Sequence, residues 1–211
     1  MTKPDSLIFD MDGTLWDNVH TYTDAWNKAV VIKGYKGEKI KREELEKYMG
    51  KEISEIVRGL FADLKNEQVE ELFREVEHQY RLLVPDMQPR IYDGVVEGLK
   101  KLSKKYPLFL LSNCEEGGLV NFMNHTKTTH LITDYMEHGQ NMKPKSFNMK
   151  LLKERNNLKY PVYIGDTDSD SKASFEAGLP FVFVSYGFGK TDNYAFKFDS
   201  FSQIVEYFLN L

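Results

Sequence analysis

The chain has 211 residues, of which 41% are hydrophobic and 28% charged, and its formal net charge is −4. These values are typical of a globular protein and exclude a wholly disordered, collagen-like or coiled-coil chain. A broad nucleic-acid or membrane footprint needs a net basic surface, so the acidic balance argues against both kinds of partner. The single cysteine, Cys114, cannot form an intramolecular disulfide, and no apolar run has the length of a membrane helix. We therefore expect a cytoplasmic protein.

Short apolar runs bounded by turn residues predict buried strands of a parallel sheet. Four such runs cover residues 7–9, 108–111, 162–164 and 181–184, and weaker candidates cover 131–136 and 196–198. Helical spacing between the runs predicts helices over 94–106 and 145–156, and a further one that includes 171–177. Strands that alternate with helices are the signature of an α/β fold, here with a Rossmann-like parallel sheet.

The pattern changes between residues 15 and 88, where no strand-like run is found. Helical spacing predicts four helices there, over 20–33, 41–49, 53–61 and 67–84. In the last of these, apolar side chains recur on one face, which predicts an amphipathic helix. We therefore predict an α/β core domain made of residues 1–14 plus 89–211, and an inserted α-helical cap domain over residues 15–88.

Two carboxylates, Asp10 and Asp12, follow the first predicted strand directly. In open α/β sheets, ligands bind at the carboxyl ends of the strands, where the strand order reverses. Side chains alternate along a strand, so both carboxylates face one side if the strand stays regular, and Gly13 allows a tight turn. Because Asp and Gly also form ordinary turns after strands, this segment alone fits a turn as well as a site.

A second acidic cluster, formed by Asp166, Asp168 and Asp170, follows the strand predicted at 162–164. Like charges repel, so such a cluster favours either a solvated loop or a bound cation. The alternate spacing invites an EF-hand interpretation, which fails because the sixth and twelfth positions are Ser171 and Ala177. A Mg²⁺ site that shares one or two carboxylates with a phosphate fits the cluster better.

Two further signals are weak when taken alone. Ser112 and Asn113 follow the strand predicted at 108–111 and offer a hydroxyl and an amide at the same sheet edge. Lys143 precedes Pro144, which keeps Lys143 out of the helical region and places it in a loop. Together, the acid pair, the hydroxyl, the lysine and the acid cluster come in chain order, each at a strand end or a helix start.

In this order the motifs resemble those of the haloacid dehalogenase superfamily, and within it the phosphatases similar to phosphoglycolate phosphatase. Residues 10–15 (Asp-Met-Asp-Gly-Thr-Leu) match its first motif, Ser112 its second, Lys143-Pro144 its third and residues 165–170 its fourth. The resemblance covers nearly the whole chain, and residues 15–88 fall where such enzymes carry a helical cap.

The resemblance implies a Mg²⁺-dependent phosphatase that acts on a small phosphorylated metabolite through an aspartyl-phosphate intermediate. Asp10 would be the nucleophile, and Asp12 would act first as general acid and then as general base. Mg²⁺ would be held by Asp10, the backbone carbonyl of Asp12 and Asp166, with Asp170 as a direct or indirect partner.

The resemblance also implies a phosphate-binding set made of Ser112, Asn113 and Lys143. In the cap, Lys51 and Arg58 are candidate contacts for the anionic tail of a substrate. For a charge on an exposed helix, however, solvation is the commoner role.

Two other functions remain open. A phosphomutase could share the fold, but mutases of this group more often carry Gly-Val after the second aspartate, whereas this chain has Gly13-Thr14. A non-catalytic binding module is a second alternative, against which the retention of the motif residues argues. The substrate is open among phosphoglycolate, pyrophosphate, a sugar phosphate and a nucleoside monophosphate.

Overall fold

The computed structural model describes residues 3–35, 39–51 and 53–211. The chain divides into two compact units, one formed by Met1–Trp16 with Ile91–Leu211 and the other by Asp17–Arg90. Each of these divisions lies two residues beyond the boundary predicted from the sequence.

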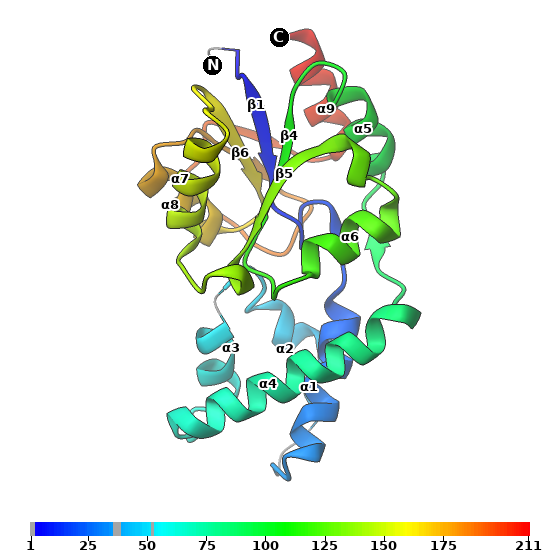
Figure 1. Ribbon diagram of the computed structural model, residues 1–211, viewed down its shortest axis with the longest axis vertical. Helices are drawn as coiled ribbons and strands as arrows, with labels where there is room; N and C mark the ends of the chain where they lie inside the picture. The colour runs from blue at the N-terminus through cyan, green and yellow to red at the C-terminus, as the bar shows by residue number, and fades with distance from the viewer. Residues whose placement is uncertain (1–2, 36–38, 52) are drawn as a thin grey trace. The chain divides into compact units, whose positions relative to one another are not determined.

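The first unit contains a six-stranded sheet in which every pair of neighbours is parallel (Figure 1). The spatial order is β5 (Ile132–Glu137), β4 (Leu108–Ser112), β1 (Ser6–Phe9), β6 (Pro161–Gly165), β7 (Phe181–Val184) and β8 (Phe196–Phe198). After β1 the chain forms β4 and β5 on one side of it, and then β6, β7 and β8 on the other side. The strand order therefore reverses at β1. The carboxyl end of β1 is therefore the position at which α/β sheets bind ligands. The predicted α/β class with a parallel sheet is confirmed.

The four inner strands are buried along their whole length, whereas the edge strands β5 and β8 are partly exposed. Strands covered on both faces read as continuous apolar runs, which explains why the inner four gave the clear signal in the sequence. Helices α7 (Lys145–Arg155) and α8 (Asp168–Ala177) cover one face of the sheet, and α5 (Val95–Leu102) and α9 (Phe201–Asn210) cover the other (Figure 1).

Helix α6 (Gly118–Thr126) contacts β4 and β5. Neither α6 nor α9 is among the helices predicted from the sequence. Three short 3₁₀ turns complete the described elements, at η1 (Val84–Asp86), η2 (Thr129–Leu131) and η3 (His138–Gln140). Within the described residues, no helix combines the length and the apolar character needed to span a bilayer.

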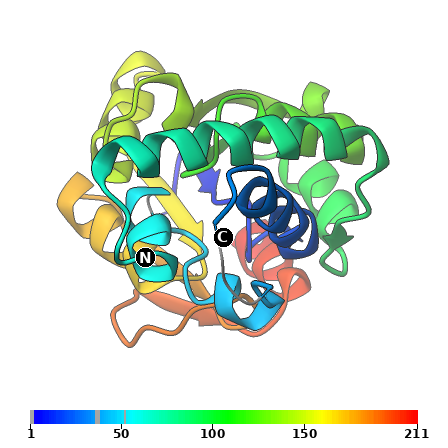
Figure 2. The ribbon, with the colours of Figure 1, turned by 90° about the horizontal axis from the view of Figure 1, so that it is seen from below.

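The second unit is helical, with α1 (Val19–Ile32), α2 (Arg42–Glu46), α3 (Ile53–Leu60) and α4 (Asn66–Leu83). Helices α1 and α4 pack against each other (Figure 2), and the rings of Tyr22 and Tyr80 stack with centroids 4.7 Å apart. Helix α2 is shorter than predicted, because residues 47–49 form a turn.

Two short strands, β2 (Trp16–Asp17) and β3 (Arg90–Ile91), form a separate sheet where no strand was predicted.

Phe109 tests the core of the α/β unit. It lies in β4, is 1% exposed, and belongs to the hydrophobic cluster on one face of the sheet. We expect Phe109→Ala to lower the free energy of unfolding by about 3–5 kcal/mol, because it removes a buried ring and leaves a cavity. Chemical denaturation measures the change. The matched control is Phe175→Ala in α8, where the ring is 80% exposed and the effect should stay within about 0.5 kcal/mol. Equal losses in the two variants would contradict the assignment of this core.

Candidate active site

The carboxyl ends of β1, β4 and β6 bring the sequence motifs to one edge of the sheet. Asp10 is the first residue after β1, Ser112 is the last residue of β4, and Asp166 is the first residue after β6. The backbone N–H of Asp10 donates to the carbonyl of Ile164 at 2.8 Å, so the pairing of β1 with β6 extends to the motif itself. The parallel sheet thus places segments more than 150 residues apart side by side.

Three carboxylates meet at this edge. Asp10, Asp166 and Asp170 each offer one oxygen, and these oxygens lie within 4.8 Å of one another. All three residues are at most 1% exposed. Burial and the charge of Asp170, opposed by Lys145, raise the pKa of Asp10 to about 6. Burial and the charges of Asp170 and Asp10 also raise the pKa of Asp166. Buried carboxylates at this spacing suit a divalent cation, because Mg²⁺ prefers oxygen ligands and would offset the repulsion.

Lys145 is the positive charge within the cluster. Its Nζ lies 2.9 Å from Asp10 Oδ1 and 2.5 Å from Asp170 Oδ1, and the side chain is 3% exposed. Burial alone would lower the pKa of Lys145, but the carboxylates of Asp10 and Asp170 outweigh it and raise this pKa. The ammonium is therefore charged and offsets part of the negative charge of the cluster.

This position corrects one expectation from the sequence, which assigned the lysine of the site to Lys143. Lys143 is exposed, and its carbonyl oxygen lies 3.0 Å from Nδ1 of His138. Pro144 is the N-cap residue of α7, so the helix begins at Lys145. Lys145 shares the buried face of α7 with Asn148, Met149 and Leu152, whereas Phe147 is 46% exposed.

Asp170 is oriented by the first turn of α8. The N–H and the hydroxyl of Thr167 donate to Asp170 Oδ2 at 3.0 and 2.6 Å, and Asp170 N–H donates back to the Thr167 hydroxyl at 3.1 Å. This reciprocal capping box satisfies backbone groups at the helix start and directs Oδ1 of Asp170 to Lys145.

Asp166 is enclosed by two loops. The N–H of Phe188 donates to Asp166 Oδ2 at 2.7 Å, and the hydroxyl of Thr14 donates to Oδ1 at 3.4 Å. A Cβ on Gly13 or on Gly187 would lie 2.1 or 2.4 Å from Oδ2, closer than any real contact. Gly13 also has φ of +82°, which other residues rarely adopt. The backbone can therefore approach this carboxylate only because these two positions carry no side chain.

Asp12 lies outside this group of three but is also buried, at 7% exposure. The indole Nε1–H of Trp16 donates to Asp12 Oδ1 at 2.8 Å. The backbone between Asp12 and Trp16 forms a tight turn. Gly13 N–H donates to the carbonyl of Trp16, and Leu15 N–H donates to the carbonyl of Met11, both at 2.8 Å.

Ser112 is 5% exposed and lies opposite Glu137, the last residue of β5, in the sheet register. Glu137 is also buried, and its carboxylate accepts from the N–H groups of Gly117 at 2.9 Å and Leu119 at 2.6 Å. It thereby caps the start of α6, the helix that follows the segment carrying Ser112 and Asn113. Glu137 could not be predicted from the sequence, because the bonds that give it this role join residues about 20 apart.

Lys51 and Arg58, the candidate contacts for the anionic tail of a substrate, each have a partner within the helical unit. The ammonium of Lys51 lies 5.2 Å from the ring centroid of Tyr48. The guanidinium of Arg58 donates to Asn66 at 3.4 Å in an exposed position.

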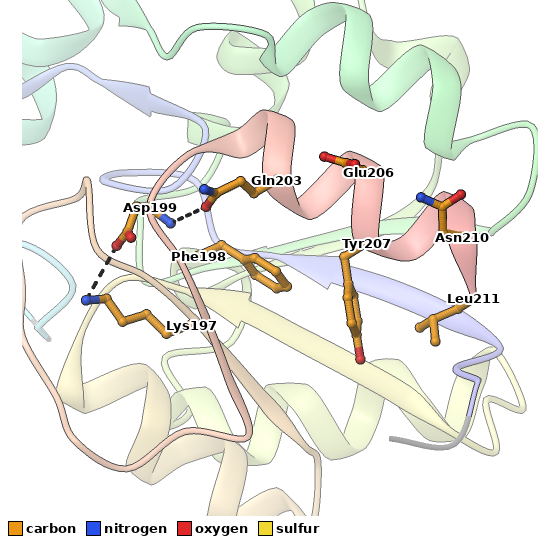
Figure 3. A pocket seen from close by; sticks show the side chains of 8 residues that line it. All are labelled: Lys197, Phe198, Asp199, Gln203, Glu206, Tyr207, Asn210 and Leu211. Atoms are coloured by element: carbon orange, nitrogen blue, oxygen red, sulfur yellow. Dashed lines mark hydrogen bonds and ion pairs between the residues drawn. The ribbon is translucent and has the colours of Figure 1, made fainter.

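A separate hollow of about 630 Å³ lies between β8 and α9 (Figure 3). In it, Lys197 pairs with Asp199 at 3.4 Å, and the backbone N–H of Asp199 donates to Gln203 at 2.8 Å. None of the predicted site residues lines it, and β8 is three strands away from β1.

The fold is that of an α/β enzyme, and the carboxylate cluster is its candidate site, at the point where the strand order reverses. A family model described as haloacid dehalogenase-like hydrolase matches residues 7–184. The chain therefore belongs to the haloacid dehalogenase-like hydrolases, as its motifs predicted.

The chain is also similar to two curated phosphoglycolate phosphatases. It is 26% identical to that of Rhodobacter capsulatus, over 94% of both chains. It is 23% identical to that of Nitrosococcus oceani, over 89% of this chain and 87% of the relative.

Solved structures show the same fold. A predicted phosphatase from Clostridium acetobutylicum superimposes with a TM-score of 0.87 over 100% of both chains, at 18% identity. A predicted phosphoglycolate phosphatase from Haemophilus somnus superimposes with a TM-score of 0.81 over 98% of this chain and 99% of that one, at 20% identity.

Removing the buried ammonium tests the electrostatic balance of the cluster. We expect Lys145→Ala to lower the free energy of unfolding at neutral pH by about 3–5 kcal/mol, because two buried carboxylates lose their partner. Without Lys145 the pKa of Asp10 rises beyond its value of about 6, so the protonated form stabilises the fold at low pH and this stability is lost as the pH rises. Denaturation at several pH values should therefore show a smaller deficit at pH 5 than at pH 8.

The control is Lys143→Ala, which removes an exposed lysine two residues away and should change the stability by less than about 0.5 kcal/mol. A larger loss in Lys143→Ala than in Lys145→Ala would contradict the placement of the charge at Lys145.

Proposed function

We propose that this protein is a Mg²⁺-dependent phosphatase that hydrolyses a small phosphorylated metabolite through an aspartyl-phosphate intermediate. The observation that carries the proposal is the buried cluster of Asp10, Asp166 and Asp170 with Lys145 at the end of β1. The family and the names of the curated relatives support phosphate ester hydrolysis, and phosphoglycolate is the first substrate to test.

Asp10 supplies the nucleophile. A carboxylate oxygen forms a bond to phosphorus while the bond from phosphorus to the ester oxygen breaks, which is covalent catalysis by a carboxylate. A pKa of about 6 leaves Asp10 mostly ionised at neutral pH, and the ammonium of Lys145 favours that ionised form. The buried position also keeps bulk water away from the reacting carboxylate.

The charge of the transferring phosphoryl group needs positive partners. Asp10, Asp166 and the backbone carbonyl of Asp12 would hold Mg²⁺, with Asp170 as a direct or indirect partner. When bound, the ion would supply positive charge opposite the phosphate oxygens. Lys145 supplies a second positive charge from α7, in the role that the sequence analysis gave to Lys143.

Asp12 serves as the general acid, giving a proton to the leaving oxygen, and then as the base that removes a proton from the hydrolytic water. Ser112 and Asn113, at the end of β4 and just after it, bind phosphate oxygens through their hydroxyl and amide groups. The helical unit is a cap that selects the substrate, and Lys51 and Arg58 are its candidate contacts for an anionic tail. The buried, unpaired thiol of Cys114 fits a cytoplasmic location.

A phosphate-release screen over phosphorylated metabolites tests the function. With Mg²⁺ present, we expect release from phosphoglycolate or another small phosphate ester. Asp10→Ala should lower kcat by roughly 10⁴-fold or more, because the nucleophile is lost. The variant, purified in the same way and shown to be folded by circular dichroism, also controls for contaminating phosphatases. Full turnover by folded Asp10→Ala would rule out the aspartyl-phosphate mechanism.

The role of the acidic cluster is tested by metal titration. We expect a chelator to abolish activity and Mg²⁺ to restore it. Asp166→Asn should weaken Mg²⁺ binding by at least about 10-fold in calorimetry, because it replaces a buried carboxylate of the cluster. Asp168→Asn is the matched control, since Asp168 is half exposed and paired with Lys172. Equal Mg²⁺ affinities in the two variants would show that Asp166 does not hold the metal.

A further inference from the structure

Trp16 makes a buried contact that the proposed mechanism has not used. Its indole Nε1 lies 2.8 Å from Asp12 Oδ1, and the tryptophan is 0% exposed. In the sequence, Trp16 follows the first motif and could pack as an ordinary core residue. Packing alone, however, would not require its single polar atom to meet the carboxylate that serves as general acid.

The ring of Trp16 is held in one orientation. Phe122 of α6 packs edge-on against it, with ring centroids 5.3 Å apart and planes at 88°, and His125 lies at 6.4 Å. The backbone of Trp16 is fixed by its N–H to the carbonyl of Met11 and by its carbonyl to the N–H of Gly13. These ring contacts and backbone bonds, all within the α/β unit, hold the indole so that its N–H points at Asp12.

The chemistry of the donor favours one oxygen of Asp12 as the carrier of its proton. An indole nitrogen only donates, so Asp12 Oδ1 must accept. The carbonyl oxygen of a carboxylic acid is its better acceptor, so in the acid form of Asp12 this bond favours the proton on Oδ2, the oxygen that does not face Trp16. We propose that Trp16 is a positioning residue that orients the Asp12 carboxyl and presents the Oδ2 proton to the leaving group. This inference rests on the proposed phosphatase function.

The proton balance of the reaction makes this contact useful. As the bond between Asp10 and phosphorus forms and the ester P–O bond breaks, the Oδ2 proton of Asp12 passes to the leaving oxygen. The hydrogen bond from Trp16 then meets a carboxylate, and a bond to an ionised acceptor is stronger than one to a neutral acceptor. The contact thus favours the state reached after proton transfer. In the second step Asp12 takes a proton from water as the oxygen of that water attacks phosphorus and Asp10 is released.

Leaving groups that differ in their need for a proton separate this role from packing. An alkyl phosphate expels an alkoxide and needs the acid, whereas p-nitrophenyl phosphate expels a stable phenolate and needs little help. The ratio kcat/KM reports the steps up to the departure of the leaving group. We expect Trp16→Phe, which keeps a ring but removes the N–H, to lower kcat/KM for the alkyl ester by about 10-fold or more. The loss for the nitrophenyl ester should be less than about 3-fold.

Phe122→Leu is the matched control, because it disturbs the packing around Trp16 and keeps the indole N–H. It should change kcat/KM for the two esters by the same factor. Equal factors in Trp16→Phe would overturn the positioning role and leave the phosphatase intact. If the wild-type protein, with Mg²⁺, releases phosphate from neither ester nor from any metabolite, the proposed function itself fails.

A second measurement does not depend on the folding of Trp16→Phe. The chain has two tryptophans, so its NMR spectrum holds two indole N–H signals, which Trp26→Phe assigns. We expect Asp12→Ala to shift the Trp16 signal and to speed its exchange with solvent by at least about 10-fold, while the Trp26 signal stays in place. An unchanged Trp16 signal would show that the indole does not bond to Asp12 and would overturn the proposal.

Discussion

The candidate site depends on three buried carboxylates that one ammonium only partly neutralises. Asp10, Asp166 and Asp170 would repel one another in a dry interior, and Lys145 offsets part of that charge by contacting two of them. Each group comes from a different element: the end of β1, the end of β6, the first turn of α8 and the first residue of α7. The parallel sheet and the two helices on one of its faces are therefore needed together. The same imbalance leaves the cluster suited to a divalent cation.

Much of the fold could be predicted from the sequence because the inner strands are buried on both faces and read as continuous apolar runs. Helices α6 and α9 were missed for different reasons. Helix α6 begins at Gly118 directly after the N-cap Gly117, and glycine is a poor helix former. Helix α9 has Ser200 as an N-cap and an apolar face formed by Phe201, Ile204, Val205 and Phe208, so its signal was present and overlooked.

The candidate site was most predictable where motif residues follow strands directly. Asp10, Asp166 and Ser112 have that position, and the structure brings all three to one edge of the sheet. Lys145 was missed because the proline suggested a lysine before the helix rather than one on its buried face. The helical period that joins Lys145 to Met149 and Leu152 was the signal that could have found it. The N–H of Phe188 could not be found in this way, since it reaches Asp166 across 22 residues of chain.

The glycines around Asp166 change how that residue type should be interpreted in this protein. Glycine is usually counted as a source of flexibility, yet Gly13 and Gly187 lie where two loops press against one buried carboxylate. These glycines matter because they lack a side chain: an oxygen of Asp166 occupies the space that a methyl group would fill at each position. The requirement at these two positions is therefore steric rather than chemical. Neither glycine has a conservative replacement, since even alanine, the next smallest residue, is too large.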